Sequence, residues 1–484
     1  CKRLYSDLFL VLPQDSIGLV NRWILMAAFD KILWMTERES ALIPVLQREL
    51  VRFSHDLHEM LPNALQDRLT RLMAYCETSR DEALPQRYEG ELRKIEEARR
   101  QITPDTVIVI SFLLDPFVEC IDSWTFFTYL RTKGVRAKYV IPRICRFYEK
   151  VVSISQWRSD VVMIDEKEGG RSYEILDKIL PFLYRTKAIV MEDGFLPSGM
   201  SDCFRKMDKL LFAFVGHGIT YIWYNDLMNR LMSRFNVVRA NRMEISRIEG
   251  YYQDRQREIP FRFIDASCPR YDLLPTENDA TENLVLISLT WRPDLNTTDK
   301  LRRSFYFRRL VQFLMSSKWR ELSAKGIKFV FSVHHAMKRT LNDDIPIDRQ
   351  AITIIDSLEV SSYIRKARCL VTDLSSVAFD FIYQNKPVVF WLPDADDYEL
   401  SFVSRDKLKS AQEGLACLMG YTCDLEEVFR QIERYSQNGF KTDEDVRKIS
   451  ERFFPHKGVA CKCLYEGLCE RWEQEYGQVA GSVQ

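Results

Sequence analysis

The sequence of 484 residues predicts an α/β protein with two Rossmann-like, doubly wound domains in series and a helical region before them. Three observations lead to this prediction. Residues up to about 103 follow helical spacing. From about residue 104 to 275, short apolar runs alternate with amphipathic stretches, and the alternation starts again at about residue 281. Alternation of this kind is typical of a parallel sheet covered by helices.

Residues 1–103 are predicted to form a helical accessory region. The stretch ELRKIEEARR, Glu91 to Arg100, has the mixed charges of a solvated helix face. Trp23, Phe29 and Trp34 allow either docking on a membrane surface or packing in a core, and core packing is the simpler interpretation. The apolar positions at helical spacing are Val20, Trp23, Ile24, Ala27 and Ala28.

Residues 104–275 are expected to form a domain around the first sheet. Its strands should be buried on both faces, because buried parallel strands are nearly continuous apolar runs. The predicted strands are TVIVISFLL, RAKYVIP, DVVMID, KAIVMED and KLLFAFVGHG, and the helices between them include SWTFFTYLRTKG and SYEILDKILPFLYR.

Residues 276–422 are expected to form a second domain around another parallel sheet. Residues 423–484 have the pattern of helices, which we expect to pack back across the cleft between the domains. The predicted strands are NLVLISLTW, IKFVFSVHH, ITIID, RCLVTD and KPVVFWLPD, and the predicted helices are RRSFYFRRLVQFLMSSKWRELSAKG and SSYIRKA.

Two doubly wound domains in series place the carboxyl ends of both sets of strands beside a shared cleft. Ligands of open α/β sheets bind at these strand ends. This is the architecture of the GT-B glycosyltransferases, so the pattern predicts a site between the domains. Architecture alone does not establish the reaction.

Composition excludes some functions and favours a cytoplasmic protein. Acidic and basic residues balance at 69 each, whereas nucleic-acid-binding proteins carry a basic excess. The longest run without Asp, Glu, Lys or Arg, Leu210–Asn225, is shorter than the roughly 20 apolar residues of a spanning helix. The chain shows no secretory signal, and it opens with CKRLYSDLF without an initial Met, so we expect a piece of a longer multidomain protein. Its 12 cysteines include no CxxC pair, which favours reduced thiols over a zinc site.

Three of the six histidines follow predicted strands directly. His217 ends a strand of the first sheet, between Gly216 and Gly218, and His334 and His335 end a strand of the second sheet. Histidine can accept or donate a proton near neutral pH, and flanking glycines let the backbone approach a ligand closely. Each could equally be a hydrogen-bonded loop histidine, but their occurrence at strand ends of both sheets favours a shared site.

Two further features of the second sheet point to a phosphate. Arg292 in LTWRPD follows a strand, where it can bind phosphate with two hydrogen bonds or form a surface ion pair. In TDLSSVAFDF, Asp373, Ser375 and Ser376 separate a strand from an apolar helix. Capping alone would explain these residues, but a helix N-terminus also attracts anions. Together with the histidines, they favour a phosphate-binding turn.

These motifs resemble the CDP-glycerol glycerophosphotransferases, the family of teichoic-acid polymerases and primases. The resemblance covers about 200 residues in the same order and with similar spacing, and TDLSSVAFDF is its most specific part. The matching segments are GHGITY from residue 216, SCPRYDLL from 267, SLTWRPD from 288, SVHHAMK from 332, TDLSSVAFDF from 372, NKPVVFWLPD from 385, and Tyr398.

The chain departs from the family pattern at several positions. Ile219, Thr220, Tyr221 and Ile222 replace the Thr-Pro-Leu-Lys that follows the first histidine in the family. His335 replaces a proline, and Leu374 replaces a tyrosine before the paired serines. Changes beside the first histidine affect the acceptor side, so they bear on the acceptor and the transferred polyol more than on the reaction type.

The resemblance implies transfer of a polyol phosphate from a CDP-linked donor to a hydroxyl, with release of CMP. It also implies that residues 104–275 form the acceptor-side domain and residues 276–422 the donor-binding domain. In this scheme His217 is the base, His334 stabilises the pyrophosphate or leaving group, and Arg292 neutralises phosphate charge. The expected donor-binding residues are Gly218, Arg270, His335, Asp373, Ser375 and Ser376. No tightly bound cofactor is implied. Metal dependence stays open, and a solvated acidic loop is the simpler interpretation of Asp394, Asp396 and Asp397.

The expected partners are CDP-glycerol or CDP-ribitol as donor and a glycan, lipid-linked or polymer acceptor, in teichoic-acid or capsule synthesis. Such acceptors would place the protein at the inner face of the cell membrane. Two alternatives stay open: a GT-B enzyme that transfers a sugar from a nucleotide sugar, and an inactive binding module of a larger polymer-assembly protein. CMP release from a CDP-polyol would distinguish polyol phosphate transfer from both of these alternatives.

Overall fold

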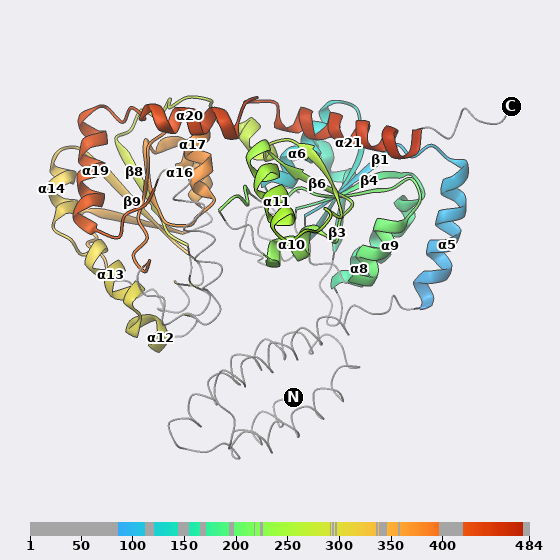
Figure 1. Ribbon diagram of the computed structural model, residues 1–484, viewed down its shortest axis with the longest axis horizontal. Coiled ribbons are helices and arrows are strands. Elements are labelled where there is room, and N and C mark those ends of the chain that lie inside the picture. The colour runs from blue at the N-terminus through green and yellow to red at the C-terminus, as the bar shows by residue number, and fades with distance from the viewer. Residues whose placement is uncertain are drawn as a thin grey trace, which may run out of the picture.

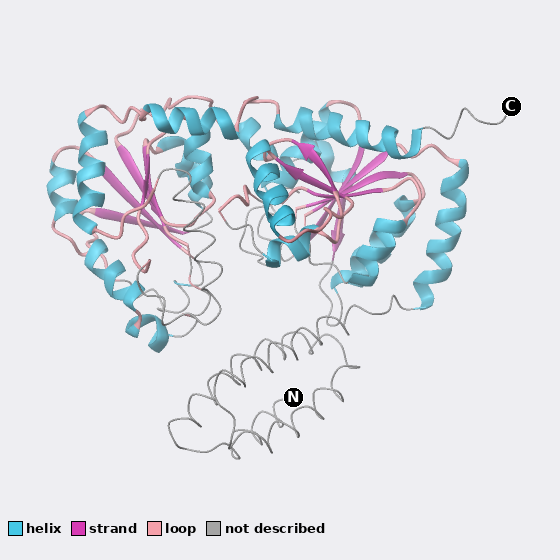
Figure 2. Ribbon diagram, viewed as in Figure 1, coloured by secondary structure: helices cyan, strands magenta, loops and turns pink. Residues whose placement is uncertain are grey.

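The computed structural model describes residues 86–111, 121–143, 153, 155–164, 171–192, 198–216, 218–222, 226–290, 292, 295, 298–334, 337, 346–356, 359–395 and 420–477. The predictions for residues 1–85, including those for Trp23, Phe29 and Trp34, lie outside this part of the chain. Two parallel sheets with helices around them form the described part (Figures 1 and 2). This confirms the predicted α/β class.

Helix α5 (Gln86–Gln101) covers the charged stretch predicted to be a solvated helix face. That prediction is wrong at Arg99, which is fully buried. Its guanidinium donates to the carbonyls of Thr186 and Asp208 at 2.8 Å each, and burial lowers its pKa to about 10. A buried guanidinium needs such acceptors because an unpaired buried charge is costly. Arg99 therefore anchors α5 to the first sheet.

The first sheet has seven described strands in the order β3-β2-β1-β4-β5-β6-β7, all parallel to their neighbours. The strands are β1 (Thr106–Ile110), β2 (Arg136–Pro142), β3 (Val161–Ile164), β4 (Thr186–Met191), β5 (Leu211–Phe214), β6 (Val237–Ala240) and β7 (Arg262–Asp265). Its helices are α6 (Ile121–Thr132), η2 (Ser155–Asp160), α8 (Arg171–Leu183), α9 (Ser198–Lys206), α10 (Asp226–Met232), α11 (Arg242–Asp254) and η3 (Pro269–Leu273). The order reverses between β1 and β4, which is the topological switch point of this sheet.

The second sheet has five described strands in the order β10-β9-β8-β11-β12, again parallel throughout. The strands are β8 (Leu284–Ser288), β9 (Lys328–Val333), β10 (Ile352–Asp356), β11 (Cys369–Thr372) and β12 (Val388–Phe390). Its helices are α12 (Thr298–Arg303), α13 (Phe305–Leu314), α14 (Lys318–Ala324), α16 (Val360–Lys366) and α17 (Val377–Tyr383). Its switch point lies between β8 and β11.

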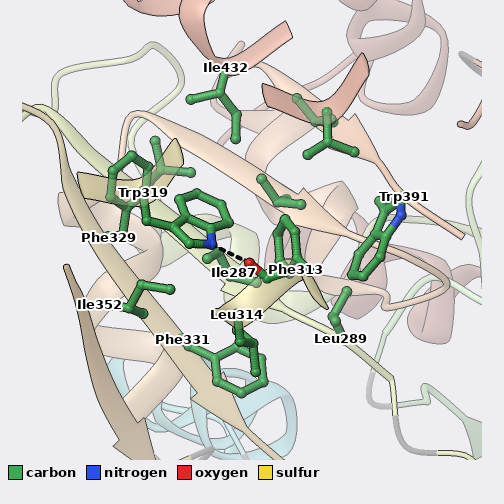
Figure 3. Packing of buried hydrophobic residues seen from close by; sticks show 14 of the residues in the cluster. Ile287, Leu289, Phe313, Leu314, Trp319, Phe329, Phe331, Ile352, Trp391 and Ile432 are labelled. Atoms are coloured by element: carbon green, nitrogen blue, oxygen red, sulfur yellow. Dashed lines mark hydrogen bonds between the residues drawn. The ribbon is translucent and has the colours of Figure 1, made fainter. Parts of the chain in front are cut away.

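One face of the second sheet carries an aromatic core (Figure 3). Trp319 and Phe313 meet edge to face with ring centroids 4.8 Å apart, and Trp319 Nε1 donates to the Phe313 carbonyl at 2.5 Å. The indole N–H is thereby satisfied inside an apolar cluster, as burial requires. This core fixes α13 and α14 against the sheet, while the opposite face turns toward the first domain.

A second hydrophobic cluster joins the two domains. It combines Ile219 and Tyr271 of the first domain with Phe379 and Tyr383 of α17. The rings of Tyr271 and Tyr383 stack with centroids 4.9 Å apart. Relative motion is the default for domains with small polar interfaces, so a shared apolar cluster favours a fixed arrangement at this point.

The C-terminal helices run from the second domain back to the first (Figure 1). Helix α19 (Leu425–Gln437) packs on β12, α20 (Glu444–Phe453) contacts both α17 and α11, and α21 (Ala460–Tyr476) packs on α6, β7 and η3. Asp272 of η3 accepts hydrogen bonds from the first backbone N–H groups of α21, at Ala460 (2.7 Å) and Cys461 (2.8 Å). The exact domain boundaries stay predictions.

Candidate active site

Two of the three predicted histidines, His217 and His335, lie outside the described residues. His334 follows the last residue of β9 and is half-buried. It therefore lies at the carboxyl edge of the second sheet, where ligands of such sheets bind.

The backbone on either side of residue 217 is held by a buried ion pair. Arg239 of β6 donates to the carbonyls of Val215 (2.8 Å) and Gly218 (2.9 Å), and to Glu244 at 3.0 Å. Glu244 in turn accepts from the backbone N–H of Thr220 at 2.6 Å. Because both charged side chains are buried and paired, this clamp fixes the backbone at Val215 and Gly218.

The β11–α17 turn carries the predicted phosphate-binding residues. Asp373 Oδ1 accepts from the backbone N–H of Leu374 at 2.6 Å and of Thr290 at 2.8 Å, so it ties this turn to the end of β8. Ser375 Oγ accepts from the N–H of Val377 at 3.3 Å, whereas the side chain of the N-cap residue, Ser376, makes no capping hydrogen bond. Ser376 is the residue that precedes α17.

The turns of the two domains meet at Gly218 and Ser376. A Cβ atom placed on Gly218 would lie 3.2 Å from Ser376 Oγ and 3.3 Å from Ser376 Cβ. Separations this short are tighter than ordinary van der Waals contact, so glycine at position 218 leaves room for the Ser376 side chain to lie against its backbone. The structure thus brings together two site residues that are far apart in the sequence.

Arg292 is held by two carboxylates, that of Asp373 in the β11–α17 turn and that of Asp394 after β12. It donates to both oxygens of Asp394 at 2.7 Å each and to Asp373 at 2.8 Å, and its guanidinium lies 4.7 Å from the ring centroid of Tyr306. Burial alone would lower the pKa of Arg292, but Asp394 and Asp373 raise it well above its ordinary value. The side chain is a permanent cation that braces the turn, and its contact with phosphate stays a prediction.

Arg270 of η3 lies between the domains. Its Nη1 donates to Asp122 of α6 at 2.8 Å, and its Nε and Nη2 donate to Asp380 of α17 at 2.8 and 3.2 Å. Burial alone would lower its pKa, but Asp380 and Asp122 raise it well above the ordinary value. The predicted donor-binding arginine is thus part of a buried ion-pair network, and its contact with the donor stays a prediction.

Sequence reasoning missed two polar residues at the switch point of the first sheet. Ser111 and Glu192 directly follow the paired residues Ile110 and Met191 of β1 and β4. Both are buried, and Ser111 Oγ and Glu192 Oε1 lack hydrogen-bond partners within the described ranges. Burial, followed by the charge of Asp122, raises the pKa of Glu192 well above its ordinary value. Glu192 could have been found in the sequence as the acidic residue that directly follows the apolar run in KAIVMED.

The departures from the family pattern have a packing explanation. Ile219, Tyr221 and Ile222, beside the first histidine, are buried in the cluster that joins the domains, and so is Leu374. Apolar side chains here fill the interface rather than project a polar group. Thr220 is the exception, because its Oγ1 donates to Glu244 at 3.0 Å.

No group of acidic, histidine or cysteine side chains in the described part of the chain has the arrangement of a metal site. Asp394 is engaged by Arg292 rather than standing in a solvated loop, so that interpretation is wrong for this residue. Asp396 and Asp397 lie outside the described residues. Within the same limits, no helix is both long and apolar enough to cross a membrane.

Two parallel sheets of Rossmann-like strand order, bridged by C-terminal helices, define a two-domain α/β protein with a GT-B-like fold. Residues 250–460 match the family model described as CDP-Glycerol:Poly(glycerophosphate) glycerophosphotransferase. The family resemblance predicted from the motifs is therefore confirmed over this region.

Two curated relatives share this similarity. The chain is 22% identical over 349 residues to the minor teichoic acid biosynthesis protein GgaB of Bacillus subtilis, covering 67% of this chain and 35% of that protein. It is 24% identical over 229 residues to the teichoic acid poly(glycerol phosphate) polymerase of Bacillus spizizenii, covering 43% of this chain and 53% of that protein. The chain thus spans between a third and about half of the length of these relatives.

Solved structures to which this chain is similar include the wall teichoic acid polymerase TagF, at 15% identity and a TM-score of 0.44, covering 80% of this chain and 95% of that one. They also include a protein titled as a putative UDP-N-acetylglucosamine 2-epimerase from Listeria monocytogenes, at 12% identity and a TM-score of 0.49. That match covers 77% of this chain and 98% of the other.

Proposed function

We propose that this chain transfers a polyol phosphate, with glycerol phosphate as the first candidate, from a CDP-linked donor to an acceptor hydroxyl in teichoic-acid-like polymer synthesis. The family match over residues 250–460 and the two teichoic-acid relatives support the donor class. CDP-ribitol is the alternative donor, and capsule synthesis is the alternative setting.

The observation that carries this proposal is the approach of Gly218 to Ser376. The motif predicted to hold the base on the acceptor side and the motif predicted to hold the diphosphate on the donor side meet at this point. In-line phosphoryl transfer needs little covalent help from a protein, but it needs the two reactants to be held close and aligned. Two rigidly braced turns that face each other supply that positioning.

In the proposed reaction the acceptor oxygen attacks the β-phosphorus of the donor. A new oxygen–phosphorus bond forms, the bond from the β-phosphorus to the bridging oxygen breaks, and CMP leaves with that oxygen. The acceptor proton passes to His217, and His334 stabilises the leaving group. Ser375, Ser376 and the backbone of their turn bind the diphosphate, and Asp373 and Arg292 hold that turn in place.

Release of CMP tests the reaction class. The substrates are CDP-glycerol and CDP-ribitol, each with and without a short polyol-phosphate oligomer, and the proteins compared are the wild type and His217→Ala. We expect acceptor-dependent release by the wild type and its loss in the variant. The control is Arg242→Lys, which alters an exposed ion pair with Asp265 on the first domain.

Release from neither CDP-polyol by folded protein would contradict the proposal. Turnover with a nucleotide sugar instead would establish a glycosyltransferase, and nucleotide binding without any turnover would establish a binding module. Repeating the assay with a chelator decides the metal dependence that the sequence left open. Sedimentation with liposomes that carry a lipid-linked acceptor tests the predicted position at the membrane face.

A further inference from the structure

Arg270 forms ion pairs that join a helix of the first domain to a helix of the second. Asp122 lies in the first turn of α6, and Asp380 lies in α17. The three side chains are nearly removed from solvent, with exposed fractions of 15% for Arg270, 2% for Asp122 and 1% for Asp380. Each carboxylate therefore depends on Arg270 as the cation that balances it.

The Arg270 network lies directly against the contact between the two turns. A Cβ on Gly218 would be 3.8 Å from Arg270 Nη1 as well as 3.2 Å from Ser376 Oγ. Asp380 lies one helical turn after Ser376, so a displacement of Asp380 displaces the start of α17 with it. The backbone N–H of Arg270 also donates to Asp122, at 2.9 Å, which fixes the position of η3 relative to α6.

Tyr271 and Asp272, which follow Arg270 in the sequence, also contact elements that join the two domains. Tyr271 stacks on Tyr383, the last residue of α17, and Asp272 holds the first residues of α21. Three consecutive residues of the SCPRYDLL motif therefore contact the first domain, the second domain and the C-terminal helix. A segment with contacts of this kind is suited to holding domains in register.

The chemistry at Arg270 requires an arginine rather than a general cation. The planar guanidinium presents several N–H groups in a fixed fork, and it can serve two carboxylates on different sides at once. A lysine is a point charge that keeps the charge balance but cannot reproduce both sets of hydrogen bonds. Replacing Arg270 with lysine therefore keeps the positive charge but removes part of the hydrogen-bond geometry.

We propose that Arg270 is a positioning residue, which ties α6 to α17 and so sets the spacing between the Gly218 turn and the Ser376 turn. This inference rests on the proposed function, because that spacing matters only if the acceptor and the donor meet there. It gives Arg270 a role different from the donor contact expected from the family resemblance.

The test separates binding from transfer. The variants are Arg270→Lys and Arg270→Gln, with Arg242→Lys as the matched arginine control on the surface. We expect kcat for acceptor-dependent CMP release to fall by at least about tenfold in Arg270→Lys and further in Arg270→Gln, which is about 1.4 kcal/mol or more in the barrier. The dissociation constant for CDP, measured by calorimetry without acceptor, should change less than about twofold, well under 1.4 kcal/mol.

A parallel loss of CDP affinity and kcat would overturn the inference and restore Arg270 as a donor contact. An unchanged kcat with unchanged affinity would overturn it as well. Either result differs from failure of the proposed function, in which the wild type itself releases no CMP from either CDP-polyol.

A second measurement does not depend on activity or on the Arg270 variants. Asp122 and Asp380 belong to different domains, share Arg270 as their hydrogen-bond partner and lie close enough to repel each other, so the effects of Asp122→Asn and Asp380→Asn on the urea midpoint should be clearly non-additive in the double variant. Additive effects would show that Arg270 does not couple the two helices, and would contradict the inference.

Discussion

Arg270 and Arg292 are chemically alike, yet they stabilise different parts of the molecule. Each guanidinium donates to two aspartates, and each arginine side chain is largely removed from solvent, with exposed fractions of 15% for Arg270 and 9% for Arg292. The partners of Arg292 both belong to the second domain, where Asp373 and Asp394 follow the ends of β11 and β12. The partners of Arg270 belong to two domains. One network therefore fixes the shape of a turn, whereas the other fixes the distance between turns.

The largest expected effect comes from removing the cation at Arg292. Arg292→Met leaves Asp373 and Asp394 buried without a counter-charge, and breaking such a pair typically costs about 3–5 kcal/mol. We expect a loss of this size in the free energy of unfolding from urea denaturation, together with weaker CDP binding because the Asp373 turn loosens. Arg270→Lys should leave CDP binding intact. Equal CDP affinities in both variants would remove the distinction between the two arginines.

The close approach at Gly218 should be sensitive to a single methyl group. In Gly218→Ala the new Cβ meets Ser376, and overpacking of this kind costs about 1–3 kcal/mol. We expect lower stability and a lower rate of CMP release. Gly250 in α11 is the control, because a Cβ there meets nothing within 4 Å and Gly→Ala in a helix stabilises by roughly 0.4–1 kcal/mol. A neutral Gly218→Ala would mean that the domains do not approach as described.

Glu192 supplies a pH-dependent test beside the Arg270 network. Burial and the charge of Asp122 raise its pKa, while the N–H and hydroxyl of Ser123 and the charge of Arg270 lower it, with a net rise well above the ordinary value. Above pH 4.5 the unfolded chain loses this proton and the folded chain keeps it, so Glu192 lowers stability as pH rises toward its folded pKa.

Glu192→Gln should therefore raise the melting temperature at pH 7 by about 2–4 °C, the shift that about 1 kcal/mol produces in domains of 150–250 residues. The gain should disappear near pH 4, where Glu192 is protonated in both states. Melting curves at the two pH values measure this difference, and a variant that is less stable at pH 7 would contradict the raised pKa.

The smallest effect is expected where an ion pair is exposed. Arg242 and Asp265 have exposed fractions of 69% and 46%, so solvent screens their attraction. Arg242→Gln should change the free energy of unfolding by about 0–1 kcal/mol. Urea denaturation of Arg242→Gln and Arg292→Met compares the contribution of an exposed ion pair with that of a buried one. A comparable loss in the free energy of unfolding in both variants would contradict the explanation by burial.

Elements whose apolar runs were continuous could be predicted from the sequence. Strand β2 consists of the predicted stretch RAKYVIP, and β10 consists of ITIID, each with the predicted ends. Strands β6 and β7 were missed because each is four residues long and contains a charged residue, such as Arg239 in VVRA. The partner that makes Arg239 acceptable inside a sheet, Glu244, is evident only from the fold.

The candidate site could be predicted in part, because some of its residues lie at positions that the local sequence pattern identifies. Strand-end positions located Arg292 and Asp373, and the position before the helix located Ser375, whose Oγ accepts from the Val377 N–H. Which carboxylate each arginine binds could not be predicted, since Asp122 lies 148 residues before Arg270 in the chain. Contacts at that separation depend on how two domains pack, which local pattern does not encode.

The most direct test of the central claim is to follow both products of the transfer at once. CDP-glycerol labelled in the glycerol is incubated with a short polyol-phosphate acceptor, and label in the acceptor is compared with CMP released. The proposed function predicts one labelled glycerol phosphate joined to acceptor for each CMP, and neither product in His217→Ala. CMP without labelled acceptor would indicate hydrolysis, and no CMP from folded protein would contradict polyol phosphate transfer by this chain.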